Sequence, residues 1–534
     1  PRSTLFPYTT LFRSAPMASP QKARYPLFFP MYLHPEWGRE GARITRLKLV
    51  PTTLSAGGVE IALNYLRASY DVRMPVMNGL LTFSASKFWL WTGDDEFLRL
   101  MMPKLRRSML FMLEHLRGRQ EGLLDLSWLV GHDGLGGDEP GHGLIGSYWD
   151  LLPAGRYDIE SSLFYYNALQ ALAEMERAAT ARGWSFPEVS VIGPDDRTHI
   201  IYKETAESLA SLAAQAKAAI ERRFWVPKTG RFCRNIDVKG VKHDYGFLHF
   251  NLMALVYGVG TTEQRESILS WLDGRIIPGD TATGEDIYHW RFAPRTTTRH
   301  NEKYWFWPWN WEHERAPDHY NWQWGYQMQN GGAVPMTSLM ELIARCQTGQ
   351  PEQLERAWQR TKAIEAWYAD VKAAGGEGRD FYRAYYAGHP ERGRQQGGDA
   401  SGGLGLDREF LSDSSCGTTF PLYAFLGVNT WRDGVLEIAP ALPAELLKLG
   451  ARKVFYRGSH LTIEAGTGYV SLEGSHIKPG DRSKLKVTFP AGQGVPDVRV
   501  AGKPYHAWEQ LSDGRIRVLL SLRPVKIEVK RSAQ

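Results

Sequence analysis

Residues 302–335 read EKYWFWPWNWEHERAPDHYNWQWGYQMQNGGAVP, and the rest of the chain can be organised around them. Six tryptophans crowd this stretch, which then runs into Gln329-Asn330-Gly331-Gly332 and a helical pattern. Each indole needs apolar cover and a partner for its N–H group, so such density is costly in a plain loop. Flat aromatic faces beside amides and carboxylates suit sugars. A long loop packed by its own aromatics, without a ligand, explains the stretch equally well.

Composition limits the classes of protein to consider. The chain has 534 residues, an aromatic share of 12%, a net charge of +6 and a pI near 9.0. Its length predicts two to four domains, or one large helical domain with an appendage. Because lysines and arginines are mixed with acids, the basic balance indicates solubility and not a nucleic-acid partner. Three cysteines lie far apart in no metal-ligand spacing, and no apolar run approaches the ~18 residues of a membrane span.

Residues 1–14 are not expected to belong to the fold. Residues 4–14, TLFPYTTLFRS, resemble the translation of a sequencing-adapter oligonucleotide, so we interpret residues 1–14 as an artefact. Residues 15–55 carry many prolines and glycines without a sustained period, and we interpret them as an irregular N-terminal remnant. The compartment therefore cannot be predicted from a leader sequence.

Helical periodicity dominates from about residue 59 to 428. Between residues 95 and 116 an apolar stripe recurs every three or four residues, and Pro103 is expected at a helix first turn that splits this run. Further helices are predicted around 164–175, 209–220, 244–258, 262–272, 333–346, 352–374 and 418–428. Short turns alternate with long loops rich in glycine, tryptophan and acids. This pattern favours a ring of helix pairs with its site at one end.

From about residue 432 the period changes from 3.6 to 2. Apolar residues alternate with polar ones in 485–489, 516–518 and 525–529, and Asp433-Gly434 and Asp513-Gly514 are hairpin signals. Residues 432–534 are therefore predicted to form an antiparallel β-sandwich, packed tightly on the helices because no linker precedes it.

Three passages resemble six-hairpin glycosidases. Gly146-Ser147-Tyr148-Trp149-Asp150 resembles the Ser-Gly-Trp-Asp passage of trehalases and related α-glucosidases, and residues 329–335 resemble the Asn-Gly-Gly passage of trehalases and neutral invertases. Residues 403–405 and 433–446 resemble the closing portion of the superfamily. The resemblance implies a mainly α fold, an (α/α)6 barrel over residues 56–431 followed by the β-sandwich, and Asp150 as the general acid.

The chemistry implied is glycoside cleavage by two carboxyl groups. One is protonated and gives its proton to the leaving oxygen, while the other activates water or attacks the anomeric carbon. Aromatic surroundings such as Tyr148-Trp149 favour the protonated form of Asp150. A loop aspartate that caps a turn is the alternative.

The second carboxylate is not found where the resemblance places it. Trehalases and invertases carry a glutamate after the next helix, whereas this chain has DFYRAYY at 380–386. We expect Glu409 to be the second carboxylate, with Asp286 next. Glu285, Glu302 and Glu312 are further candidates. An Asp or Glu in such a loop more commonly caps a helix or lies exposed at the surface. The expected substrate contacts are Trp149, Arg156, Trp305, Gln329, Asn330 and Asp407.

The sequence thus predicts an exo-acting glycoside hydrolase on an oligosaccharide or α-glycoside, with a carbohydrate as its partner and with neither metal nor cofactor. The acids and histidines at 312–319 fit no metal-ligand spacing. A disaccharide phosphorylase, a polysaccharide lyase that uses Tyr and His, and a non-catalytic carbohydrate-binding protein remain as alternatives on the same fold.

Overall fold

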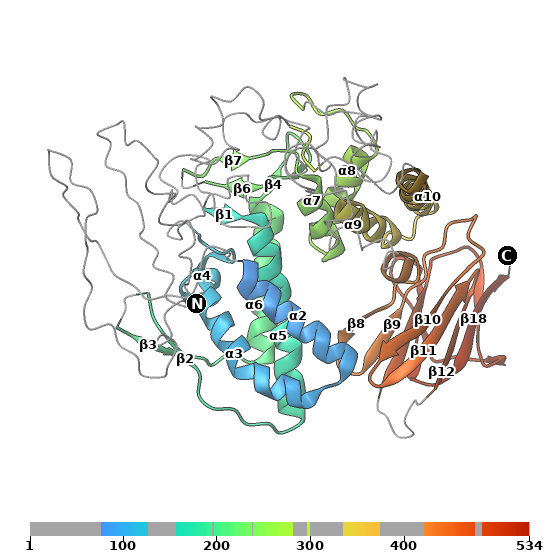
Figure 1. The fold of residues 1–534 in the computed structure, drawn as a ribbon, viewed down its shortest axis with the longest axis horizontal. Coiled ribbons are helices and arrows are strands. Elements are labelled where there is room, and N and C mark those ends of the chain that lie inside the picture. The colour runs from blue at the N-terminus through green and yellow to red at the C-terminus, as the bar shows by residue number, and fades with distance from the viewer. Residues whose placement is uncertain are drawn as a thin grey trace, which may run out of the picture.

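The computed structural model describes residues 76–126, 156–194, 197–237, 239–280, 296–299, 335–373, 421–475 and 483–532. Helices make up most of the N-terminal part and strands the C-terminal part, as Figure 1 shows. The sequence predicted this order. The helices are α2 (Val76–Thr92), α3 (Asp95–Glu114), α4 (Gly118–Glu121), α5 (Ile159–Ala181), α6 (Ala206–Arg223), α7 (Leu248–Val256), α8 (Thr262–Leu272), α9 (Pro335–Cys346) and α10 (Pro351–Ala373).

Helix α5 lies at the centre of the helical part. It is buried on nearly all sides, and its many alanines let neighbouring helices approach closely. Gly79 of α2 lies so near that an added Cβ would sit 2.8 Å from the backbone of Phe164. At the far end of the pair, the Arg182 guanidinium that follows α5 lies 5.8 Å from the ring of Trp89 in α2. The two helices therefore run in the same direction.

Helix α3 differs from the prediction. It is one helix of 20 residues with Pro103 inside it, not two pieces with the proline at a first turn. A proline in a helix interior removes one backbone hydrogen bond. The helix nevertheless continues because residues on both sides of Pro103, such as Met102 and Met109, are fully buried in the core around α5.

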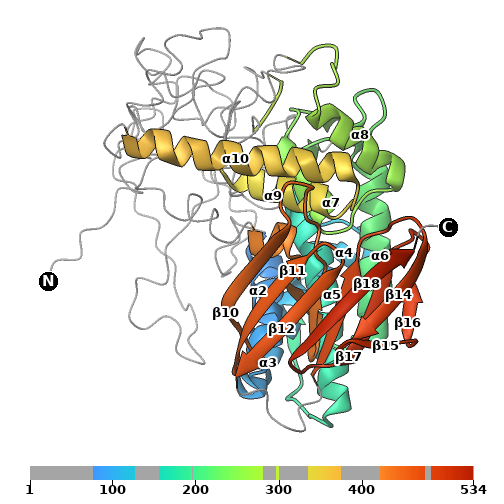
Figure 2. The same cartoon turned by 90° about the vertical axis from the view of Figure 1, so that its right-hand side faces the viewer.

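The other helices predicted between residues 164 and 374 are confirmed, α8 with its predicted bounds and the rest with shifted bounds. The residues that carried the periodicity of α6, Leu209, Leu212, Ala216 and Ile220, are all buried. Figure 2 shows that α10 runs crosswise to the direction of α5 and α6, and it packs against α9. The expected helix at 418–428 is a five-residue π-helical turn, Pro421–Phe425, in the described residues. It ends early because Gly427 turns the chain with φ +59°, where a Cβ would lie 2.3 Å from the oxygen of Ala439.

Short strands that the sequence did not predict lie among the helices: β1 (Tyr157–Asp158), β2 (Ser190–Ile192), β3 (His199–Ile201), β4 (Trp225–Val226), β5 (Arg231–Phe232), β6 (Asn235–Ile236) and β7 (Lys242–His243). Strands β1, β6 and β7 form one antiparallel sheet. In Figure 1 this sheet lies at the upper end of the helical part, where α5 begins.

The C-terminal strands form two sheets that face each other across an apolar core. They are β8 (Asn429–Arg432), β9 (Val435–Ile438), β10 (Lys448–Tyr456), β11 (Ser459–Gly466), β12 (Tyr469–Ser475), β13 (Lys484–Phe489), β14 (Val495–Val500), β15 (Lys503–Pro504), β16 (Trp508–Gln510), β17 (Ile516–Ser521) and β18 (Val525–Ser532). Both hairpin signals are confirmed, since Asp433-Gly434 joins β8 to β9 and Asp513-Gly514 lies between β16 and β17.

The sandwich departs from the predicted antiparallel arrangement at one pair. Strand β13 runs parallel to β9, with Lys484 opposite Val435 and Val487 opposite Ile438. Between these two strands the chain builds β10, β11 and β12 in the other sheet, and it then crosses back. Parallel neighbours require such a crossover, which alternation in the sequence does not reveal.

The turn between β8 and β9 joins the sandwich to the helices. Asp433 accepts bonds from Arg182 at 2.8 Å and from Arg457 at 2.6 Å. Glu174 of α5 accepts the Asp433 backbone N–H at 2.9 Å and the Arg432 side chain at 2.7 Å. The Glu174 carboxylate of α5 thus binds the β8–β9 turn of the sandwich directly. Such close contact is what the absence of a linker in the sequence predicted.

Candidate functional site

The first turn of α5 carries two buried carboxylates. Asp158 caps the helix, because its Oδ2 accepts the Ser161 backbone N–H at 2.8 Å and the Ser161 hydroxyl at 2.6 Å. Its Oδ1 forms an ion pair with Arg234, a fully buried residue after β5. Glu160 is 4% exposed, and its Oε2 lies 3.8 Å from Arg234 Nη2. The Arg234 guanidinium therefore balances the negative charge of two carboxylates at the start of α5.

Arg234 also links α5 to α7. Its carbonyl accepts the Ile159 N–H at 3.1 Å, and its guanidinium lies 4.4 Å from the ring of Phe250 in the first turn of α7. His249, beside Phe250, is 4% exposed. Burial, and then the positive charge of Arg234, lower the pKa of His249 to about 3. This imidazole is neutral near pH 7 and is not a proton donor there.

The sheet of β1, β6 and β7 adds polar groups at this end. Asp158, Asn235 and His243 stand opposite one another in register, so their side chains share one face. Both amide atoms of Asn235 are buried and have no hydrogen-bond partner in the described part of the chain. A buried amide of this kind marks a position that water or a ligand atom completes.

Asp237 fixes the turn that leads into β7. Its Oδ1 accepts the Lys239 and Val241 N–H groups at 2.9 Å each, and its Oδ2 lies 2.9 Å from His243 Nε2. Burial acts to raise the pKa of Asp237, but the bond from His243 and those backbone bonds outweigh it and lower the pKa. Asp237 is therefore a charged acceptor that holds His243 in one orientation.

Arg156 is the predicted substrate contact that the structure describes. Its Nε and Nη2 donate to Oδ2 of the buried Asp125 at 3.1 and 2.9 Å, and its guanidinium lies 4.6 Å from the Tyr157 ring. The Arg156 side chain keeps 30% of its surface exposed. It lies just before α5, at the end of the molecule that carries Asp158 and Glu160. Its role toward a sugar stays a prediction.

The other predicted site residues lie outside the described residues: Asp150, Glu409, Asp286, Trp149, Trp305, Gln329, Asn330 and Asp407. The structure adds polar residues that sequence reasoning missed, namely Asp158, Glu160, Arg234 and His249. For Asp158 and Glu160 the sequence did carry a signal, because two acids stand just before an apolar run. Arg234 and His249 had none, because their partners come from other segments.

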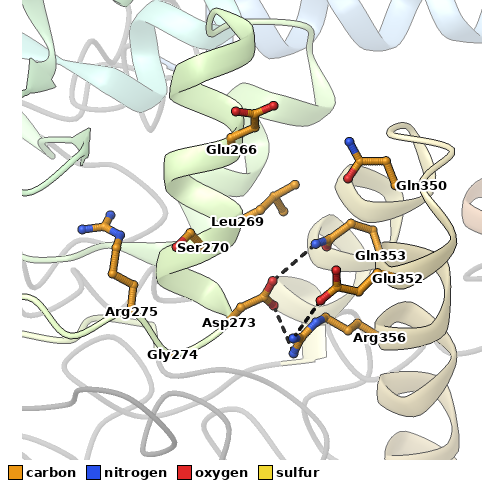
Figure 3. Close-up of a pocket in the computed structure, with 10 residues that line it drawn as sticks. All are labelled: Glu266, Leu269, Ser270, Asp273, Gly274, Arg275, Gln350, Glu352, Gln353 and Arg356. Carbon is orange, nitrogen blue, oxygen red and sulfur yellow. Dashed lines mark hydrogen bonds and ion pairs between the residues drawn. The ribbon is translucent and has the colours of Figure 1, made fainter.

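A separate depression of about 460 Å³ lies between α8 and α10 (Figure 3). Asp273 lies at its centre and receives Gln353 Nε2 at 3.3 Å and Arg356 Nη1 at 3.5 Å. Its lining holds charges of both signs and no aromatic side chain, so it does not offer the stacking surface that sugars favour. None of the predicted site residues lines it.

Among the described residues no three His, Cys, Asp or Glu side chains gather as metal ligands would. None of the helices in that part of the chain combines the length and apolarity needed to cross a bilayer.

Comparison with known proteins gave matches to solved structures. No protein-family model and no curated protein matches the chain. A GH78 family rhamnosidase of Bacillus sp. GL1 is 15% identical and is aligned over 78% of this chain and 33% of its own, with a TM-score of 0.39. A protein described as a kojibiose phosphorylase, from the human microbiome, is 8% identical over 84% of this chain and 50% of its own, with a TM-score of 0.34.

A GH127 β-L-arabinofuranosidase from Geobacillus stearothermophilus T6 is 12% identical over 86% of this chain and 72% of its own, with a TM-score of 0.28. This chain spans one third to one half of the length of the rhamnosidase and the phosphorylase. The neighbours are glycoside hydrolases and a phosphorylase, the kinds of enzyme that the sequence resemblance to six-hairpin glycosidases implies. The TM-scores of these three matches are below 0.5, so the matches assign no role to any residue of this chain.

Proposed function

We propose that the protein is a glycoside hydrolase whose site lies where α5 and α7 begin. In this proposal residues 56–431 form the (α/α)6 ring and residues 432–534 the sandwich. Asp150 is the general acid, and Glu409 or Asp286 is the second carboxylate. A protonated acid gives its proton to the leaving oxygen, and the opposite carboxylate activates water or attacks the anomeric carbon.

The observation that carries the proposal is the position of two anchors beside the predicted carboxylates. Asp150 precedes Arg156 by six residues and Asp286 follows Asp280 by six, so each Cα lies within about 22 Å of its anchor. Arg156 directly precedes β1, which leads into α5. Asp280 is paired with Arg231 of β5, which also binds Asp244, close to the start of α7. The described anchors Arg156 and Asp280 therefore lie at the same end of the molecule, which supports a site there.

The polar residues at that end support the proposal. Arg156 is fixed by Asp125 but partly exposed, which suits a contact to a sugar hydroxyl. Asp158, Glu160 and Arg234 place charged groups at the starts of α5 and α7. The first backbone N–H groups of a helix lack intrahelical partners at the same place. Glu409 has no comparable anchor, since it lies twelve residues before Pro421.

The test is a screen of aryl glycosides and disaccharides, with and without phosphate, in which NMR reads the anomer of the product. The wild type should hydrolyse at least one of them, and Asp150→Asn should lower kcat by roughly a hundredfold or more. Asp497→Asn, a surface position on β14, is the matched control and should keep full activity.

Each alternative gives a different result in the same screen. Turnover that requires phosphate indicates a phosphorylase, and an unsaturated product indicates a lyase. Binding without turnover indicates a carbohydrate-binding protein. Full activity of Asp150→Asn removes that residue as the acid.

A further inference from the structure

The side of α2 and α3 that points away from α5 carries exposed apolar side chains. The two helices pack against each other, and both pack against α5 (Figure 1). Phe88 of α2 and Phe97 of α3 join them on the outer side, with ring centroids 4.5 Å apart. The outer patch consists of four large apolar residues with their exposed fractions: Met77 49%, Leu81 45%, Phe88 48% and Leu100 65%.

The sequence of α2 does not suit a helix with one side in water. It reads VMNGLLTFSASKFWLWT and contains one charged residue, Lys87. The Lys87 Nζ donates to Asn429 Oδ1 at 2.9 Å and to the Thr430 oxygen at 2.7 Å, so this charge is turned to the sandwich. At steps of three or four positions the outer side presents Met77, Leu81, Ser84 and Phe88. A helix without charges on its outer side is typical of one that is covered there as well.

The outer side of α3 carries charges in a symmetric arrangement. Leu100 lies at its centre, with Glu96 one turn before it and Lys104 one turn after it, and both charged residues are exposed. Neither pairs with an opposite charge among the described residues. A two-fold axis at Leu100 sets Glu96 of one copy opposite Lys104 of the other, and the same pair forms again on the other side of the axis. This side of the protein is therefore complementary to itself.

The size of this side agrees with a weak interface. A helix of the length of α2 is about 25 Å long, and two helices side by side are about 20 Å wide. Contact over the whole area therefore buries about 500 Å² on each copy, or about 1,000 Å² in total, near the lower limit of specific interfaces. A dimer that dissociates with a Kd on the order of 10 µM fits such an area.

We propose that the outer patch is the interface of a homodimer, in which α2 and α3 of two copies pack around a two-fold axis at Leu100, with Glu96 opposite Lys104. Burial of the apolar side chains supplies the attraction, and the two charge pairs fix the orientation of the copies. The proposal is independent of the proposed glycoside hydrolase activity.

The experiment is sedimentation velocity of the full chain over concentrations from about 1 to about 100 µM, a range that brackets the expected Kd. The wild type should shift from monomer to dimer across it. Leu100→Glu places a carboxylate from each copy at the axis and should raise the Kd at least about a hundredfold. Leu447→Glu is the matched control, because this leucine is 74% exposed and lies just before β10, away from the outer patch. It should leave the Kd unchanged.

A charge exchange tests the two-fold arrangement itself. Glu96→Lys and Lys104→Glu each set like charges opposite one another at both ends of the contact, so each should raise the Kd about tenfold. The double variant restores opposite charges and should return the Kd to within about threefold of the wild type. Within one copy the two positions are too far apart along the helix to interact, so recovery in the double variant reports a contact between copies.

The outcomes are distinct. A wild type that stays monomeric over the whole range overturns the proposal; if Leu100→Glu then also lowers the melting temperature, the outer patch is covered within the chain. A dimer whose Kd is unchanged in Leu100→Glu has its interface elsewhere, which overturns the proposal too. Two single exchanges that weaken the dimer without recovery in the double variant overturn the placement of Glu96 opposite Lys104.

Discussion

The buried imidazole of His249 predicts a specific loss of stability in acid. Its pKa is about 3 in the folded protein and about 6.5 in an unfolded chain. Because the folded pKa is the lower one, the unfolded state takes up the proton first. Stability therefore falls as the pH drops below about 6.5, and it continues to fall until the pH reaches the folded value.

The size of this loss follows from the two pKa values. Between about pH 7.5 and about pH 5 the site contributes a decrease of about 2 kcal/mol in the free energy of unfolding, since each pKa unit corresponds to about 1.4 kcal/mol. His249→Gln has a neutral side chain at both pH values and removes this term. The variant should thus lose about 2 kcal/mol less than the wild type over that range.

Urea unfolding at both pH values measures the effect as a difference of differences, in which the other titrating groups cancel. His460→Gln serves as the control, because it makes the same substitution at a histidine that is exposed in the folded protein. If His249→Gln and the wild type lose the same stability between the two pH values, the assignment of His249 as a buried neutral histidine is wrong.

Three more predictions follow from close contacts. Gly79→Ala should cost about 1–3 kcal/mol in urea unfolding, because its Cβ meets the backbone of Phe164; an unchanged midpoint contradicts the packing of α2 on α5. Asp433→Asn should cost about 2 kcal/mol near neutral pH. Burial acts to raise the pKa of Asp433, but its two arginines outweigh burial and lower the pKa below the ordinary 3.8, so the wild-type advantage should disappear as the pH falls below that value; an advantage that persists in acid refutes the pairing. Gly246→Ala should destabilise the protein, because Gly246 adopts φ +62° and a Cβ there would lie 2.0 Å from Thr298 Oγ1; an unchanged urea midpoint contradicts this close contact.

The sequence predicted the helices and strands best where periodicity is regular. The alternation of Leu485, Val487 and Phe489 became a buried strand, and the residues that predicted α6 are all buried. These predictions succeed because burial on one face leaves a direct trace in the order of apolar residues. Pro103 misled the prediction, since burial on both sides of it outweighs the loss of one hydrogen bond.

The candidate site was less predictable, for a physical reason. Arg234 reaches Asp158 and Glu160 across more than seventy residues of sequence, and Arg231 meets Asp280 across 49 residues. Such pairs depend on how segments cross in space, and no spacing along the chain encodes them. The parallel pairing of β9 with β13 could not be predicted from the sequence for the same reason.

The contact between Glu174 and the Asp433 turn has a consequence for how the chain could be rearranged. The oxygens of Glu174 receive both a side chain and a backbone N–H from the sandwich, and Arg182 would lose Asp433 if the strands were removed. The β-sandwich therefore cannot be exchanged for an unrelated domain without the loss of these contacts. A substitute grafted onto these helices would have to supply an N–H group and a carboxylate at the same two points, which favours inheritance of the two parts together.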